Sequence, residues 1–233
     1  YTIVAGVFVL SIANVIFPEM SRMSARREDA ALDAQLCGTL STMLFFLVPM
    51  SAGLAVMARP IDRLLYEWGE WTAESTELTA GALAFASLGM VGYGLQMILS
   101  RAYYAAQKGK MPLISGIVSV VMNLALCALL TPRMGVRGLA LASAVSALVP
   151  ALVLLAALLL GGHAVMDRAS LWDFCKMLVC AAGMAAAVLA VRWDIAGFGG
   201  DGVAGRVLAV ALPTIAGVLA YFALALALGA GVM

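Results

Sequence analysis

The chain has 233 residues, of which 64% are hydrophobic and 12% are charged, and its formal net charge is +1. Its mean hydropathy is +1.03. A soluble domain carries about twice this share of charge and needs polar residues to cover its surface, so these values exclude a soluble protein. A nearly neutral chain also has no field that attracts a polyanion, so we expect no nucleic-acid partner.

Long apolar segments follow one another along the whole chain. A helix needs roughly 20 apolar residues to cross a bilayer core, and seven segments meet or approach this length. Lipid leaves an open strand edge without hydrogen-bond partners, so we predict an all-α membrane protein, a polytopic helical bundle. The chain opens inside an apolar segment, and we expect a further N-terminal part in the natural protein. The predicted spans are residues 1–17, 36–57, 78–99, 113–130, 138–160, 171–191 and 207–230.

The segment 59–71 differs from the other predicted connections. Leu64 and Leu65 fall on one helical face, and Trp68 and Trp71 supply rings that favour the depth of lipid headgroups. We predict a short interfacial helix on the outer side of the membrane. A plain loop with scattered aromatic residues is the alternative.

Residues that could carry catalytic or metal chemistry are sparse. The sequence contains no glycine-rich phosphate loop, GxSxG or HExxH motif, and its four cysteines form no CxxC pair. The single histidine, His163, has no neighbour that could share a metal. We therefore expect no enzyme activity, no cofactor and no metal. No Asp, Glu, Lys or Arg lies in the middle of a predicted span, where an ion relay would place one.

Basic residues in the connections indicate the orientation. The positive-inside rule places the more basic set of short loops in the cytoplasm. The connections after the first, third and fifth spans form the more basic set by eight residues to six, which also predicts a cytoplasmic C-terminus. The eight are Arg22, Arg26, Arg27, Arg101, Lys108, Lys110, Arg168 and Lys176, and the six are Arg59, Arg63, Arg133, Arg137, Arg192 and Arg206.

Four short motifs at the span ends resemble one known family. They are FPEMSR at 17–22, PI followed by LLY and a glycine at 60–69, LSRAYYA at 99–105 with Lys110 and Pro112, and GVRGLA at 135–140. In this order they are similar to the signatures of the MurJ (MviN) family of lipid II flippases, which belongs to the multidrug/oligosaccharidyl-lipid/polysaccharide exporters. The resemblance covers nearly the whole chain but only helices eight to fourteen of the family's architecture.

This resemblance implies a membrane transporter that moves lipid-linked peptidoglycan precursor across the bacterial inner membrane for cell-wall synthesis. The alternatives are a polysaccharide, O-antigen or multidrug exporter of the same fold, or a membrane scaffold that transports nothing. It further implies that residues 1–160 form the second lobe of the transporter, with its first helix truncated. Residues 161–233 would add two helices that form a groove for the lipid tail. The implied partners are the lipid-linked precursor, membrane lipids and a missing N-terminal lobe.

The resemblance also suggests site residues. Arg101, with Tyr103 and Tyr104, ends the third span where a headgroup would enter, and Arg22 lies in the first motif. We take these four as candidate substrate-binding residues, and a snorkelling interface anchor is the alternative for Arg101.

A second candidate site concerns ions. Some family members bind sodium through an Asn and an Asp one turn later. Asn123 matches the Asn, but Cys127 stands in the Asp position and is a poor ligand for a hard cation. Asn123 and Ser143 therefore form a candidate polar or ion site, for which an ordinary helix–helix hydrogen bond is the alternative.

Overall fold

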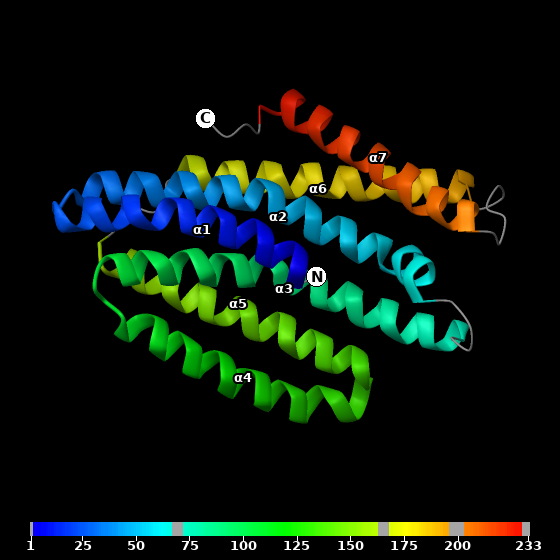
Figure 1. The fold of residues 1–233 in the computed structure, drawn as a ribbon, viewed down its shortest axis with the longest axis horizontal. Helices are drawn as coiled ribbons and strands as arrows, with labels where there is room; N and C mark the ends of the chain where they lie inside the picture. Colours follow the sequence, from blue (N-terminus) through cyan, green and yellow to red (C-terminus); the bar gives the residue numbers. More distant parts are fainter. Residues whose placement is uncertain (1, 67–71, 163–167, 196–202, 230–233) are drawn as a thin grey trace.

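The described part of the chain, residues 2–66, 72–162, 168–195 and 203–229 of a computed structural model, forms seven α-helices (Figure 1). Within that part, six helices, α2 to α7, are long and apolar enough to cross a membrane. The prediction of an all-α membrane protein is confirmed. The helices are α1 (Thr2–Ala25), α2 (Asp29–Tyr66), α3 (Ala73–Ala105), α4 (Lys110–Met134), α5 (Val136–Leu160), α6 (Arg168–Ile195) and α7 (Val203–Ala227).

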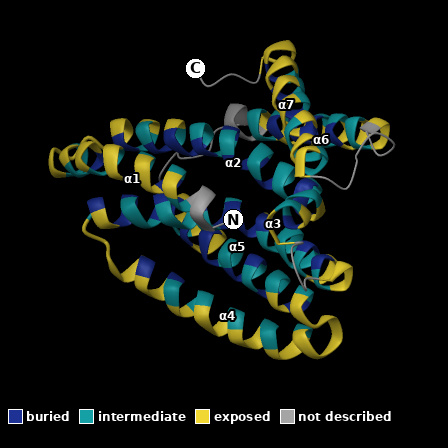
Figure 2. Ribbon diagram, turned by 45° about the vertical axis from the view of Figure 1, so that its right-hand side comes forward, coloured by how far each residue is buried: buried dark blue, intermediate teal, exposed yellow. Residues whose placement is uncertain are grey.

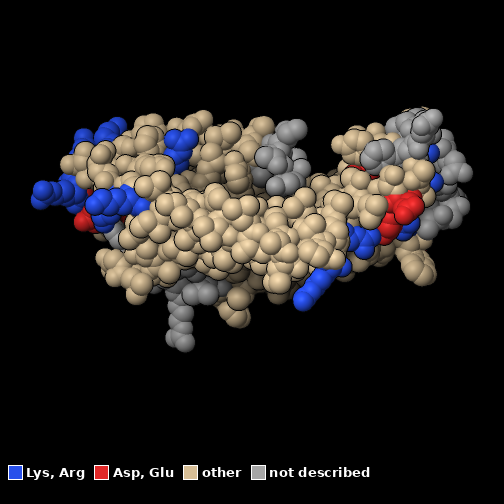
Figure 3. Space-filling model, turned by 90° about the horizontal axis from the view of Figure 1, so that it is seen from below, with Lys and Arg blue, Asp and Glu red and all other residues tan. Residues whose placement is uncertain are grey.

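Successive helices run back and forth along the long axis of the molecule (Figure 1). We call the end that holds the α1–α2 and α3–α4 connections the Arg26 end, and the opposite end, with the α4–α5 connection, the Arg137 end. Charged side chains gather toward the two ends and leave a broad uncharged band between them (Figure 3). This distribution suits a protein whose middle lies in hydrocarbon and whose ends lie in water.

Glycines allow the helices at the centre of the bundle to touch through their backbones. α3 and α5 share the most extensive contact of the fold. A Cβ added at Gly92 would lie 2.7 Å from the backbone nitrogen of Leu148, and one at Gly89 would lie 2.8 Å from the Cα of Ala144. Small residues permit such close approach in membrane helices, so α3 and α5 form a closely packed pair.

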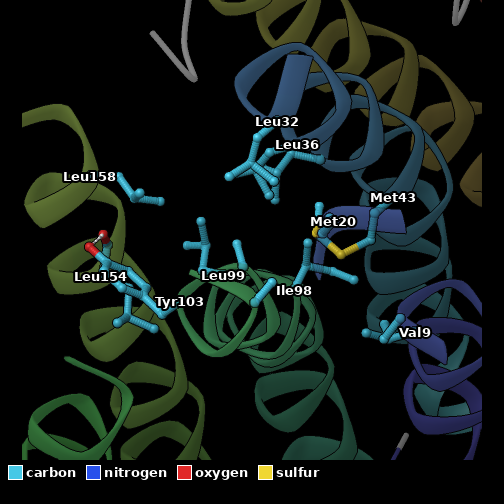
Figure 4. Close-up of a cluster of buried hydrophobic side chains, with 14 of the residues drawn as sticks. Val9, Met20, Leu32, Leu36, Met43, Ile98, Leu99, Tyr103, Leu154 and Leu158 are labelled. Atoms are coloured by element: carbon cyan, nitrogen blue, oxygen red, sulfur yellow. Dashed lines mark hydrogen bonds between the residues drawn. The ribbon is translucent and has the colours of Figure 1, made fainter. Parts of the chain in front are cut away.

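The main core lies where α1, α2, α3 and α5 meet, toward the Arg26 end. Val9, Met43 and Leu99 are fully buried there, and Leu154 joins them from α5 (Figure 4). The outer faces are also apolar, above all on α4, where Leu113 and Leu124 are about two-thirds exposed (Figure 2). An apolar outer face needs lipid or another protein segment to cover it.

The predicted interfacial helix at 59–71 is wrong in its first half. α2 continues without a break through Pro60 to Tyr66, so these residues belong to the preceding transmembrane helix. A proline normally removes a helical hydrogen bond, but here Arg192 of α6 donates a hydrogen bond to the freed carbonyl of Val56, at 2.7 Å. Trp68 and Trp71 lie outside the described residues, as does His163.

Candidate functional site

An apolar groove lies between α2, α6 and α7. Its volume is about 290 Å³, and bulky apolar side chains of all three helices form its walls. The lining residues are Phe46, Pro49, Met50, Gly53, Leu54, Met57, Ile61, Met184, Val188, Thr214, Gly217, Val218, Tyr221 and Phe222.

The groove is shaped by a close contact on one side and an aromatic cluster on the other. A Cβ at Gly217 would lie 2.6 Å from Cγ2 of Val188, so α7 approaches α6 closely at this glycine. The rings of Phe45 and Tyr221 are 5.3 Å apart, and Phe222 packs edge-on against both. The groove therefore sits beside a well-packed contact rather than in a loose gap between helices.

The lining offers no polar group for a charged ligand. The Thr214 hydroxyl donates a hydrogen bond to the carbonyl of Val210 in its own helix, at 2.7 Å. The Tyr221 hydroxyl donates one to the carbonyl of Phe45, also at 2.7 Å. Because both hydroxyl hydrogens are used within the protein, the groove suits a hydrocarbon chain and lacks the groups for covalent catalysis.

Asn123 joins α4 to α5 through a small polar network. Its amide nitrogen donates hydrogen bonds to the hydroxyls of Ser146, at 2.9 Å, and Ser143, at 3.5 Å. The thiol of Cys127 donates to the amide oxygen at 3.6 Å. The structure thus brings Asn123 and Ser143 together as the sequence suggested, and adds Ser146. No cluster of three His, Cys, Asp or Glu residues suited to a metal occurs in the described ranges.

The four candidate substrate-binding residues do not converge on one point. The Arg101 guanidinium lies over the Phe17 ring, 5.5 Å from its centroid. Tyr104 is exposed, whereas Tyr103 is 4% exposed and donates its hydroxyl to the carbonyl of Leu154, at 3.1 Å. Arg22 pairs with Glu19 at 3.6 Å on the surface. Arg101 and Tyr104 therefore remain near the Arg26 end, while Tyr103 holds α3 to α5.

Charged residues at the Arg137 end link three helices. Glu77 of α3 pairs with Arg59 of α2 at 3.3 Å and with Arg137 of α5 at 3.5 Å. The Arg137 side chain crosses α3 directly over Gly81, in the space that a Cβ would occupy. Sequence reasoning noted these arginines only as orientation signals. The glycine one turn after an acidic residue was the available hint, but it does not identify the partner.

Comparison with known proteins decides the family. The sequence model described as "Lipid II flippase MurJ" matches residues 1–200 of the chain. The chain belongs to the MurJ family of lipid II flippases. The MurJ match ends before α7, so one wall of the apolar groove lies beyond it.

Two relatives extend the comparison. A "Probable lipid II flippase MurJ" of Rhizobium meliloti (strain 1021) is 33% identical over 195 residues, which are 83% of this chain and 36% of the relative. One of Vibrio cholerae serotype O1 is 29% identical over 224 residues, 96% of this chain and 43% of the relative. The chain thus spans less than half the length of these MurJ proteins.

A solved structure shows the same arrangement of helices. "Lipid II flippase MurJ, inward closed conformation" superimposes with a TM-score of 0.79 at 25% identity. The match covers 97% of this chain and 44% of that protein. It therefore includes nearly all of α6 and α7, and the groove lies within a region that has a counterpart in a known MurJ structure.

Proposed function

We propose that the complete protein flips lipid-linked peptidoglycan precursor across the bacterial inner membrane, and that this chain supplies its C-terminal half. The observation that carries the proposal is the match to the MurJ family together with a groove that has no free polar donor. Residues 1–160 act as a transport lobe. Residues 161–233 supply α6 and α7, which complete the groove for the lipid tail.

The groove accommodates part of a polyprenyl chain. Its volume of about 290 Å³ is near the lower limit of pockets that enclose a drug-sized molecule, so it holds a segment of the tail while the rest lies in the bilayer. Gly217 keeps the groove narrow, because it lets α7 approach Val188 of α6. A narrow apolar slot favours a thin flexible chain over a bulky ring system.

Cationic and aromatic residues near the Arg26 end contact the headgroup. Arg101 and Arg22 offer guanidinium groups, which bind phosphate through paired hydrogen bonds. Tyr104, three residues after Arg101, adds an exposed ring at the same end. Tyr103 contributes by fixing α3 against Leu154 of α5. The Arg26 end and the C-terminus face the cytoplasm in this proposal, because the connections at that end are the more basic set.

Rescue of a bacterium depleted of its own lipid II flippase tests the function. The full-length protein should restore growth. A full-length version with Gly217→Leu, whose side chain would clash with Val188 in the groove wall and push α7 away from α6, should be inserted in the membrane but rescue poorly. A matched control is Gly116→Leu, because a Cβ at Gly116 meets nothing within 4 Å. Failure of the unaltered protein to rescue, at normal membrane levels, would favour a polysaccharide or multidrug exporter or a scaffold.

Labelling of single cysteines in intact cells tests the orientation. A membrane-impermeant reagent should label position 68 and spare positions 26 and 101. The reverse pattern would place the Arg26 end outside.

A further inference from the structure

Three prolines inside the helices free backbone carbonyls in the interior of the bundle. Proline has no amide hydrogen, so the carbonyl four residues earlier loses its helical hydrogen bond. Pro49, Pro60 and Pro150 thereby free the carbonyls of Phe45, Val56 and Ser146. In lipid no water replaces the lost donor, so a donor from the protein stabilises a carbonyl freed in this way.

A side chain from another helix supplies each missing donor. The Tyr221 hydroxyl of α7 reaches the Phe45 carbonyl at 2.7 Å. Arg192 of α6 reaches the Val56 carbonyl at 2.7 Å, and the Ser119 hydroxyl of α4 reaches the Ser146 carbonyl at 2.9 Å. The same exchange of a backbone donor for a neighbour's side chain thus occurs three times.

This pairing is not automatic. Prolines inside other helices also free carbonyls, but no side chain of the described residues donates a hydrogen bond to them. These prolines are Pro18, Pro132 and Pro213, which free the carbonyls of Asn14, Ala128 and Ala209. The three paired carbonyls therefore mark contacts between particular pairs of helices, namely α2 with α6, α2 with α7 and α4 with α5.

Two of the three donors connect α6 and α7 to α2. Tyr221 and Arg192 take the two proline-freed carbonyls of that helix, eleven residues apart in sequence. The apolar groove lies along the same part of α2, because Pro49 and Met57 line it together with Tyr221 itself. A helix bends most easily at a proline, where no internal hydrogen bond has to break.

We propose that Tyr221 and Arg192 are positioning residues that fasten α7 and α6 to the two proline sites of α2, so that an apolar chain entering the groove changes the bend of α2. The identity of that chain, a polyprenyl tail, rests on the proposed function. The fastening itself rests only on the hydrogen bonds. α6 and α7 then do more than line the groove, because they connect its occupancy to a helix of the transport lobe.

A double-mutant cycle in the full-length protein tests the fastening. Tyr221→Phe leaves the Phe45 carbonyl without a partner and should shift the unfolding equilibrium constant roughly tenfold, the usual effect of a buried unsatisfied group. Pro49→Ala restores a backbone donor to that carbonyl. Tyr221→Phe should therefore have little effect in the Pro49→Ala background. An equal effect in both backgrounds would overturn the proposal.

A control variant makes the cycle specific, and a second proline site provides an independent cycle. Tyr103→Phe removes a similar buried hydrogen bond from a hydroxyl to the Leu154 carbonyl. That carbonyl is not freed by a proline, because the residue four positions later is a leucine with a backbone N–H. The effect of Tyr103→Phe on unfolding should be smaller than that of Tyr221→Phe and should not depend on Pro49. If Pro49→Ala does not fold, Arg192→Met with Pro60→Ala provides the same cycle at the second site.

A distance measurement tests the coupling to the groove. Spin labels at Ala34 and Leu65, both exposed on α2, bracket the two prolines in a full-length protein whose native cysteines are replaced. Adding a 55-carbon polyprenyl phosphate in nanodiscs should shift the label distance by about 2 Å, the scale of helix shifts in switching proteins. The Tyr221→Phe, Arg192→Met double variant should lose most of the shift. Bound lipid with an unchanged distance would refute the coupling, whereas failure of the lipid to bind would refute the proposed groove ligand.

Discussion

Replacing Gly92 by alanine tests how closely α3 and α5 are packed. The new methyl group would lie 2.7 Å from the Leu148 nitrogen and 2.8 Å from the Ala147 carbonyl carbon. Non-bonded carbon atoms prefer about 3.5 to 4 Å, so the helices must separate by almost 1 Å. All the nearest atoms belong to the backbone, so no side-chain rotation relieves the clash. Overpacking of this kind costs about 1–3 kcal/mol.

Gly116→Ala is the matched control for this prediction. A Cβ at Gly116 meets nothing within 4 Å, and both glycines lie inside helices, so the gain in helix propensity cancels between the two variants. The difference in free energy of unfolding therefore isolates the clash, and we expect about 2 kcal/mol in favour of Gly116→Ala. Reversible unfolding of the full-length protein in mixed detergent measures it. Equal stability of the two variants would show that α3 and α5 are not in backbone contact.

Three other predictions concern charged and polar residues. Arg101→Ala should abolish rescue of a flippase-depleted strain and Arg101→Lys should restore it partly, because Lys keeps the charge but not the planar fork; wild-type rescue by Arg101→Ala would identify an interface anchor. Glu77→Gln should lower the free energy of unfolding by no more than about 1 kcal/mol, since its ion pairs are half exposed; a larger loss would show that the Arg137 end is tightly locked. Asn123 should not act as a sodium ligand during transport by the full-length protein, because its amide is hydrogen-bonded to neutral groups. A sodium requirement for transport that disappears in Asn123→Ala would contradict this.

The helical architecture could be predicted because lipid allows few alternatives. An apolar run of about 20 residues in a chain with so little charge can satisfy its backbone only as a helix. The family motifs could also be recognised in the sequence. They lie at the ends of the apolar spans, where the few polar residues of the chain are concentrated. The ends of the helices were harder to predict. The segment 59–71 was predicted to be a separate interfacial helix, whereas α2 continues through Pro60. The hydrogen bond from Arg192, 136 residues away, to the carbonyl that Pro60 frees could not be read from the sequence.

The candidate site shows a second limit, which arises from helix geometry. Tyr103 and Tyr104 are adjacent in the sequence and were assigned one role, but successive residues on a helix point about 100° apart. One ring is therefore buried against α5 and the other is exposed. Asn123 and Ser143 could be paired because a polar residue inside a span needs a partner. The family resemblance implied a groove on residues 161–233, but the wall that α2 adds could not be predicted. That wall depends on distances between three helices, which Gly217 and the aromatic cluster around Tyr221 help to set.

The contacts among α3, α4 and α5 differ in kind from the contacts of α2 with α6 and α7, and this difference indicates which helices move. α3 touches α5 backbone to backbone at Gly89 and Gly92, and the Asn123 network joins α4 to α5, so these three helices are held as one block. α2 differs, because the side chains that complete its hydrogen bonding at Pro49 and Pro60 come from α6 and α7, outside this block, whereas the donor at Pro150 of α5 is Ser119 of α4, inside it. A side-chain hydrogen bond can lengthen or exchange without unwinding a helix, whereas the α3–α5 contact has no such freedom. We therefore expect conformational change to move α2, with α6 and α7 attached, against a fixed block of α3, α4 and α5.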